Sequence, residues 1–329
     1  MVPDLPRLSE TSSESSSLVA VSAPAPDRFR LGDASLSLSG DEALLFRFRA
    51  ILGDCAESAA DRSLPLVHCQ VDDDGHSDVA VSFLYPGAPL DLHGFVAGLA
   101  AYAGTLRDGS GDTLRFDRQT EWRGAVANCA IQATLAIQPG ALFFHAASVD
   151  VAGRGILIAG PKNTGKSTTS LALAARGHRL LGDEIAAVRT QTSELLPFPR
   201  AVSLRDGVRS ELLDERLRGT PSLEETYPDG SRRLRIKVSD LFDRVEPQAV
   251  PLAALFFLKP FGEATRIERF LPSLDQVSLL EPLGSALWGD SGGRRRFQLL
   301  RLLSTVACYD IAPGPPDETA DRIEKLMEG

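Results

Sequence analysis

The segment GPKNTGKSTTS, residues 160–170, constrains the fold of this chain more than any other. From Gly160 to Ser167 it fits G-x-x-x-x-G-K-[ST], the pattern of a loop that surrounds phosphates between a strand and a helix. A near-continuous apolar run, RGILIAG, precedes the loop, and such a strand is expected in a sheet that is covered on both faces. The residues that follow have helical spacing up to Gly177, a plausible C-terminal cap. The sequence therefore predicts an α/β core.

The residues of the loop predict how a nucleotide would be held. Gly160 and Gly165 let the backbone turn tightly around an anion, and the N–H groups at the start of the helix point at phosphates. Lys166 would neutralise the β and γ oxygens of ATP, and the Ser167 hydroxyl would bind Mg²⁺. The expected nucleotide-binding residues are Gly160, Asn163, Thr164, Gly165, Lys166, Ser167 and Thr168.

For Thr168 and Lys162 the sequence leaves two roles open, one in nucleotide binding and one that is not. The Thr168 hydroxyl either contacts the nucleotide or forms a hydrogen bond within the first helical turn. Lys162 either adds positive charge at the tip of the loop or is a solvated surface lysine.

Composition excludes several classes of protein. The 329 residues carry a net charge of −9, which argues against a nucleic-acid-binding surface, since such a surface needs a basic stripe. No apolar run approaches the ~18 residues of a membrane-spanning helix, and the N-terminus lacks the pattern of a secretory signal. We therefore expect a cytoplasmic protein without membrane contact. The four cysteines are far apart and form no metal-ligand pattern, so we expect buried free thiols.

The chain is expected to divide into three parts. Residues 1–27 are rich in serine, proline and acidic residues, and we expect a disordered tail. Residues 28–140 predict an α+β domain, with strands at 29–40, 64–73 and 78–87 and helices at 41–52 and 123–138. Residues 141–329 predict the nucleotide-binding domain.

Within this second domain we expect further elements of both kinds. RLLGDEIAAVR, residues 179–189, predicts one strand, and RRLRIKV and AALFFLK predict two more. The polar segment 205–231 is typical of a mobile insertion. Residues 294–307 and 317–327 predict amphipathic helices, and the RRR run at 294–296 is expected to be solvated.

The segment from Phe144 to Glu184 resembles the catalytic core of the HPr kinase/phosphorylase family. The resemblance runs without a gap through His145, the phosphate loop, RGHRL at 176–180 and the acidic pair Asp183-Glu184. It implies a fold akin to phosphoenolpyruvate carboxykinases and ATP-dependent phosphorylation of a serine hydroxyl. The second acid is Glu184 where the family usually has aspartate, and KNT stands where the family tends to have a second glycine.

The resemblance also implies roles for individual residues. Asp183 is expected to accept the proton of the acceptor hydroxyl or to support Mg²⁺, and Glu184 to support Mg²⁺ or to be structural. His145 is expected to contact the catalytic acid or to be a core residue. His178 lies in a turn, where a structural role is expected. Arg200, in PFPRAVSLR, is expected to clamp a substrate phosphate or to form a surface ion pair.

The predicted function is therefore a serine kinase that uses ATP and Mg²⁺. Outside its core the chain resembles divergent relatives that act on peptides, including lasso-peptide kinases, so we expect a peptide or protein substrate other than HPr. A nucleotide-binding module without activity, a kinase of a small alcohol and a carboxykinase-like enzyme are the alternatives. The hexamers of the HPr-type relatives leave a homo-oligomer open.

Overall fold

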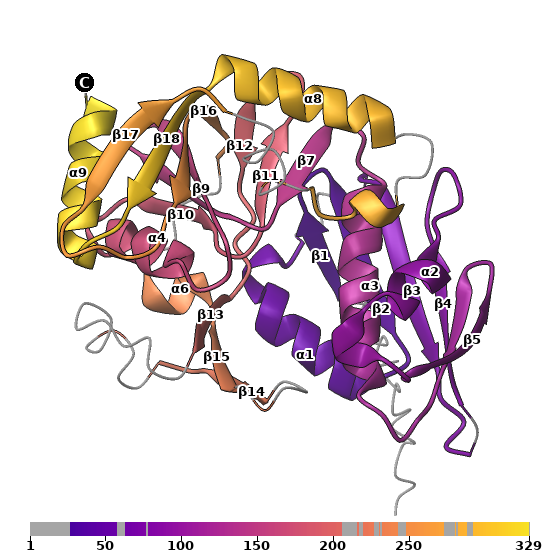
Figure 1. Cartoon of the computed structure of the whole chain (residues 1–329). Helices are drawn as coiled ribbons and strands as arrows, with labels where there is room; N and C mark the ends of the chain where they lie inside the picture. Colours follow the sequence, from indigo (N-terminus) through magenta and orange to yellow (C-terminus); the bar gives the residue numbers. More distant parts are fainter. Residues whose placement is uncertain are drawn as a thin grey trace, which may run out of the picture.

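The computed structural model describes residues 27–57, 63–76, 78–205, 216, 220–226, 230, 232–242, 248–272, 280, 282–287 and 292–328. Nearly all of the predicted tail, and most of the predicted insertion at 205–231, lie outside these residues. The described chain is a mixed α/β structure with three sheets, which confirms the predicted fold class at this level (Figure 1). None of its helices is long and apolar enough to cross a membrane.

The N-terminal region contains a six-stranded sheet with the order β1-β2-β3-β4-β6-β5. Its strands are β1 (Arg28–Leu31), β2 (Ala34–Ser39), β3 (Leu66–Asp72), β4 (Val79–Leu84), β5 (Leu106–Ser110) and β6 (Thr113–Phe116). β3 and β4, at two of the predicted strand positions, pair antiparallel. The single strand predicted at 29–40 is wrong: Gly32, with φ +73°, turns the chain, so β1 and β2 form a hairpin.

Three helices accompany this sheet: α1 (Glu42–Leu52), α2 (Leu92–Ala97) and α3 (Trp122–Ala136). The Asp41 side chain caps α1 by accepting a hydrogen bond from the Leu44 N–H at 2.6 Å. Arg123 of α3 donates to both oxygens of the same carboxylate, at 2.9 and 2.7 Å. One partly buried aspartate therefore fixes the start of α1 and joins it to α3.

A nine-stranded sheet forms the centre of the molecule, with the order β10-β8-β9-β16-β12-β11-β7 and with β18 and β17 attached beside β16. Its strands are β7 (Ala141–Phe144), β8 (Ala147–Val151), β9 (Arg154–Ala159), β10 (Arg179–Gly182), β11 (Ala186–Arg189), β12 (Glu194–Leu196), β16 (Val250–Leu258), β17 (Arg266–Phe270) and β18 (Ala307–Ala312). β9 pairs with β8 and, in parallel, with β16. The predicted interior strand before the loop is thus confirmed.

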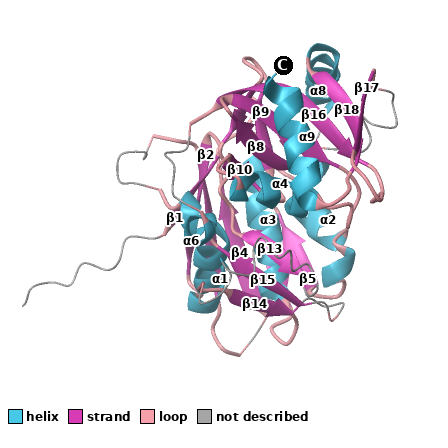
Figure 2. Ribbon diagram, turned by 90° about the vertical axis from the view of Figure 1, so that its left-hand side faces the viewer, coloured by secondary structure: helices cyan, strands magenta, loops and turns pink. Residues whose placement is uncertain are grey.

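The apolar residues of β9 alternate between two cores. Leu157 and Ala159 belong to a cluster shared with the N-terminal sheet and α8 (Gly292–Thr305), whereas Ile156 and Ile158 belong to a cluster with α4 (Lys166–Ala175) and α9 (Pro316–Glu328). Figure 2 shows α4 and α9 crossing one face of the sheet side by side. Both faces of this part of the sheet are therefore covered, as a continuous apolar run requires.

The strand predicted at 179–189 is wrong in one respect, because it consists of two strands. β10 pairs with β8, whereas β11 pairs with β7 and β12. Glu184 has φ +65°, a left-handed conformation that no strand contains. The apolar residues on the two sides of Asp183-Glu184 therefore enter different parts of the same sheet.

A small third sheet, β13-β15-β14, lies beside the central one (Figure 1). Its strands are β13 (Val202–Arg205), β14 (Leu223–Thr226) and β15 (Arg232–Ile236), and α6 (Val238–Leu241) follows. Three 3₁₀ turns complete the described elements, at Gly53–Cys55, Ala100–Tyr102 and Ser285–Leu287. All four cysteines are buried and free, as predicted.

We expect the interior of β9 to dominate the stability of the central sheet. Leu157→Ala should lower the free energy of unfolding by about 2–5 kcal/mol, because Leu157 is fully buried and its loss leaves a cavity. Leu84→Ala is the control, since Leu84 is 60% exposed, and its effect should stay within about 0.5 kcal/mol. Urea unfolding followed by circular dichroism measures both; equal effects would contradict the assignment of β9 to the core.

Candidate active site

The phosphate loop connects β9 to α4, in the predicted strand–loop–helix order. Gly165, the residue before α4, has φ +97°, and a Cβ atom there would lie 2.6 Å from the ring of Phe261. A side chain at this position would therefore strain the backbone and displace Phe261. Asn163 also has a positive φ, of 71°. The two residues give the loop the curvature that a bound anion needs.

Lys166 reaches back across the loop. Its ammonium group donates hydrogen bonds to the carbonyl oxygens of Gly160 and Pro161, both at 2.9 Å. The Thr164 hydroxyl donates to the Pro161 carbonyl as well, also at 2.9 Å. The positive charge of Lys166 is therefore held beside the loop backbone, where phosphate oxygens would displace the carbonyl contacts.

The Asp183 carboxylate lies against the first turn of α4. The Ser167 hydroxyl is 3.0 Å from both of its oxygens, and Asp183 is only 1% exposed. Burial and the negative charge of Glu184 raise the pKa of Asp183 to about 6, against the opposing hydrogen bond from Ser167. The residue after β10, Asp183, thus contacts the first turn of the helix after the phosphate loop through the hydroxyl of Ser167.

A cleft of about 750 Å³ opens over this pair. The predicted site residues that line it are His145, Asn163, Gly165, Lys166, Ser167, Thr168, Asp183 and Glu184. Lys162, Arg233 and the half-exposed Phe261 line it too. Gly160 and Thr164 belong to the same loop but do not line the cleft, and Arg200 lines a neighbouring cavity. The structure therefore brings most of the predicted residues to one cleft.

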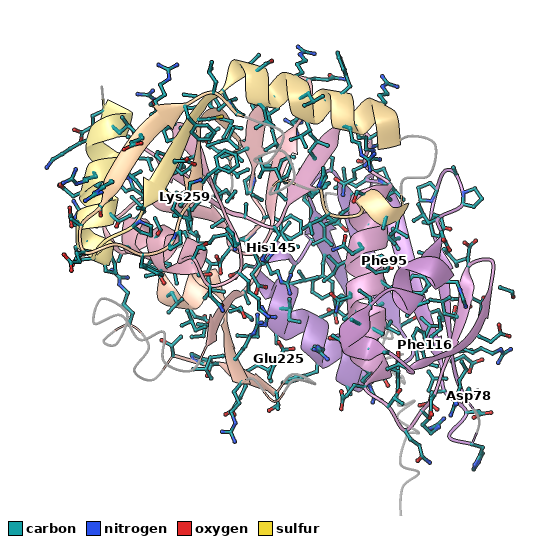
Figure 3. The ribbon with its side chains drawn as sticks, in the orientation of Figure 1. Asp78, Phe95, Phe116, His145, Glu225 and Lys259 are labelled. Carbon is teal, nitrogen blue, oxygen red and sulfur yellow. The ribbon has the colours of Figure 1, made fainter. Side chains whose placement is uncertain are left out.

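His145 follows β7 and lies near the middle of the molecule (Figure 3). Its Nδ1 atom is 3.1 Å from the backbone carbonyl oxygen of Glu184. Burial and the charge of Lys166 lower its pKa, which favours the neutral ring. The contact was predicted with the catalytic acid itself, but this hydrogen bond supports the backbone of the turn that carries Asp183.

Glu184 is held by three arginines. Its carboxylate lies 2.9 Å from Arg235, 3.3 Å from Arg233 and 3.5 Å from Arg200. Burial by itself raises the pKa of Glu184, but the charges of Arg235, Arg200 and Arg233 outweigh it and lower the pKa to about 2. Adjacent acids at this turn therefore have opposite surroundings: Asp183 faces a hydroxyl and Glu184 faces cations.

A second glutamate extends this cluster of charges. Glu225 of β14 forms ion pairs with Arg235 at 2.7 Å and with Arg47 of α1 at 2.9 Å. Figure 3 shows Glu225 below His145, on the side of the third sheet. A chain of ion pairs thus runs from the N-terminal helix to the turn at Glu184.

Arg233, Arg235 and Phe261 also lie at the site but were not predicted from the sequence. The two arginines alternate in RRLRIKV, a signal for one face of a strand, but their partner Glu184 is about fifty residues away in the chain. His178 was expected to be structural, and its ring nitrogen contacts Glu324 of α9 at 2.7 Å. Of the RRR run, Arg294 and Arg296 are exposed as predicted, whereas Arg295 is buried and donates to the Ala136 carbonyl at 2.7 Å.

Comparisons with known proteins agree with this site. A family model for the HPr Serine kinase C-terminal domain matches residues 140–203. HPr kinase/phosphorylases of Bacillus cereus (strain B4264) and Bacillus anthracis (strain A0248) are each 42% identical over 52 residues. The match covers 16% of this chain and 17% of each relative, so this chain aligns with only about a sixth of the relatives' length.

A solved structure, the Hpr(Ser) kinase/phosphatase from Coxiella burnetii, is 19% identical to this chain. The superposition covers 56% of this chain and 88% of that one, with a TM-score of 0.27. The family-model match, residues 140–203, includes the phosphate loop, His145 and Asp183. The resemblance predicted from the sequence is therefore confirmed, and the segment 140–203 is HPr kinase-like.

Proposed function

We propose that this chain is an ATP-dependent kinase that phosphorylates a serine hydroxyl of a peptide or protein. One observation carries the proposal: the Asp183 carboxylate lies 3.0 Å from Ser167 on the same cleft as Lys166. Phosphoryl transfer needs positioning and charge neutralisation, and these residues supply both. The HPr kinase-like segment and the name of its curated relatives support the same chemistry.

In the proposed reaction the triphosphate lies on the loop, with Lys166 against its β and γ oxygens. The acceptor oxygen forms a bond to the γ-phosphorus while the bond from that phosphorus to the β–γ bridging oxygen breaks. Asp183 takes the proton of the acceptor hydroxyl, and ADP leaves with the bridging oxygen. A raised pKa suits a carboxylate to this exchange, since its proton affinity is nearer to neutral pH.

The oxygen donors of Ser167 and Asp183 fit Mg²⁺, which prefers oxygen ligands and takes few from protein when phosphates supply others. We propose Ser167 as its protein ligand; Asp183 would bind the ion in the alternative in which it does not take the proton. Bound there, the ion would neutralise phosphate charge. That Glu184 also binds Mg²⁺ remains a prediction, and its three arginine partners compete for the same oxygens. We propose for Glu184, Arg200 and His145 the role of holding the Asp183 turn.

We propose that residues 141–329 form a carboxykinase-like catalytic core in a cytoplasmic enzyme and that residues 28–140 form the region beside it. One apolar cluster continues across the boundary, from Phe29 through Phe143 to Leu157, so the two parts share a core. HPr and small alcohols are the alternative acceptors, and a nucleotide-binding module without activity is the alternative class.

Mass spectrometry of candidate peptides, HPr and small alcohols after incubation with the protein, ATP and Mg²⁺ tests the function. We expect a mass gain of one phosphate on an acceptor. Asp183→Asn should lower the rate at least about 100-fold, because the amide cannot accept the proton. ATP binding measured without Mg²⁺ should change little. The control Asp72→Asn, at an exposed position of β3, should keep full activity.

Two outcomes would contradict this proposal. Nucleotide binding without phosphate transfer or release would support the inactive module instead. Full activity of the Asp183→Asn variant would remove Asp183 from the role of base.

A separate variant tests the role of Glu184. Glu184→Gln should lower the free energy of unfolding by about 1.5–3 kcal/mol, because it removes charged hydrogen bonds to mostly buried arginines. Glu224→Gln is the matched control: Glu224 pairs with Arg232 at the surface, where ion pairs contribute about 0–1 kcal/mol. Chemical denaturation measures both. Wild-type stability combined with a higher Mg²⁺ requirement would instead make Glu184 a metal ligand.

A further inference from the structure

Four strands of the central sheet run in one direction and end at the edge that carries the site. β9 is parallel to β16, and β16 is parallel to β18. β10 has the same direction as β9, because both are antiparallel to β8. Ligands of such sheets bind beyond the carboxyl ends of the strands. The phosphate loop follows β9, Asp183 follows β10 and Phe261 follows β16, so all three lie at this edge.

Asp183 and Phe261 flank the phosphate loop on opposite sides, since the strand order is β10-β8-β9-β16. Figure 3 shows Lys259, which directly follows β16, and Glu225 on opposite sides of His145. In a phosphoryl transfer the acceptor and the leaving group lie roughly in line through the γ-phosphorus. An acceptor that approaches from the side of Asp183 therefore requires the nucleoside to extend toward the side of Phe261.

Phe261 is 55% exposed, and it lines the cleft. Among the described residues five other large apolar side chains are exposed, and none of them lines this cleft: Phe46, Leu84, Leu271, Phe297 and Leu300. Most side chains around the cleft are polar or charged. The phenylalanine thus presents an aromatic ring to a site whose other groups suit phosphates.

The position of this ring is fixed by its surroundings. A Cβ atom at Gly165 would lie 2.6 Å from the ring, so the ring is held against the backbone of the phosphate loop. The turn itself is attached to the residues at the end of β18. The Lys259 N–H donates to the Ile311 carbonyl at 2.8 Å, and the Gly262 N–H donates to the Pro313 carbonyl at 2.9 Å. A group ordered before binding reduces the entropy that binding costs.

The size of the cleft and the chemistry of the ring favour the same ligand group. The cleft, of about 750 Å³, is within the ~300–1,000 Å³ of pockets for drug-sized molecules, so it has room for more than a triphosphate. Stacking of one nucleic-acid base on an aromatic side chain strengthens binding by roughly 5- to 150-fold. A nucleotide base is therefore the group that the ring would hold best.

We propose that Phe261 is the base-stacking residue of the nucleotide site. The base lies on the ring, and the triphosphate extends from it across the loop to Lys166, which leaves the side of Asp183 to the acceptor. The inference rests on the proposed function for the nature of the ligand. It adds a specificity: the site selects for an aromatic base by its face. Every base has such a face, so GTP is held in the same way as ATP.

Titration calorimetry of the full chain with Mg²⁺ and without an acceptor tests this role, with ATP, GTP and inorganic tripolyphosphate as ligands. We expect both nucleotides to bind about tenfold or more tightly than tripolyphosphate, the effect of one stacked base. Phe261→Ala should remove this difference, whereas its affinity for tripolyphosphate should match that of the wild type. Phe261→Trp should retain the difference, because tryptophan also offers an aromatic face.

Phe297→Ala is the matched control, because Phe297 of α8 is 69% exposed and does not line the cleft. It should bind all three ligands as the wild type does. Equal binding of ATP and tripolyphosphate by the wild type would overturn the proposal. A loss of affinity for tripolyphosphate as large as that for ATP in Phe261→Ala would also overturn it, since Phe261 would then only support the loop at Gly165.

Failure of this inference can be distinguished from failure of the proposed kinase. Nucleotide binding that depends on Phe261, without phosphate transfer to any acceptor, would keep the stacking residue and refute the kinase. Phosphate transfer with an unchanged KM for ATP in the Phe261→Ala variant would keep the kinase and refute the stacking residue. The absence of saturable binding of all three ligands would refute both.

Discussion

The contact between the Glu184 carboxylate and three arginines is the constraint on which the site depends. Glu184 lies in a left-handed turn, a conformation that costs energy for any residue with a side chain. Arg200, Arg233 and Arg235 come from segments on both sides of the predicted insertion and hold the carboxylate from several directions. The turn so fixed directs Asp183 to Ser167, and the same arginines connect the site to the third sheet.

Asp183 and Glu184 are adjacent carboxylic acids whose pKa values differ because their surroundings differ. Burial raises the pKa of Asp183 to about 6, whereas guanidinium charges lower that of Glu184 to about 2. Pairs of acids whose surroundings separate their proton affinities are typical of sites in which one group exchanges a proton and the other remains ionised. This division fits a proton-accepting Asp183 and a permanently charged Glu184 that binds cations of the protein itself.

The acidic net charge of the chain is compatible with a cluster of arginines around Glu184 and Glu225. Salt screens interactions between surface charges, but it screens interactions between buried groups much less. The net charge of −9 describes the whole chain, whose surface charges are screened by salt within about 10 Å. The arginines around Glu184 and Glu225 are mostly shielded from solvent, so their charges act on neighbours and on any molecule that enters the adjoining cavities. Net charge therefore supports only a prediction about the surface, that it does not bind nucleic acid, and carries no information about this interior.

The sequence by itself determined the local units: the apolar strand β9, the phosphate loop with Gly165 and Lys166, the helix α4 and the HPr kinase-like segment. These are continuous in the chain and depend on backbone conformation and apolar periodicity, which neighbouring residues specify. Only the tertiary structure decided that Asp183-Glu184 is a turn between two strands, and that Arg47 and Arg235 meet near it. Ion pairs between distant segments leave no periodic signal, because their geometry exists only after the sheets have packed.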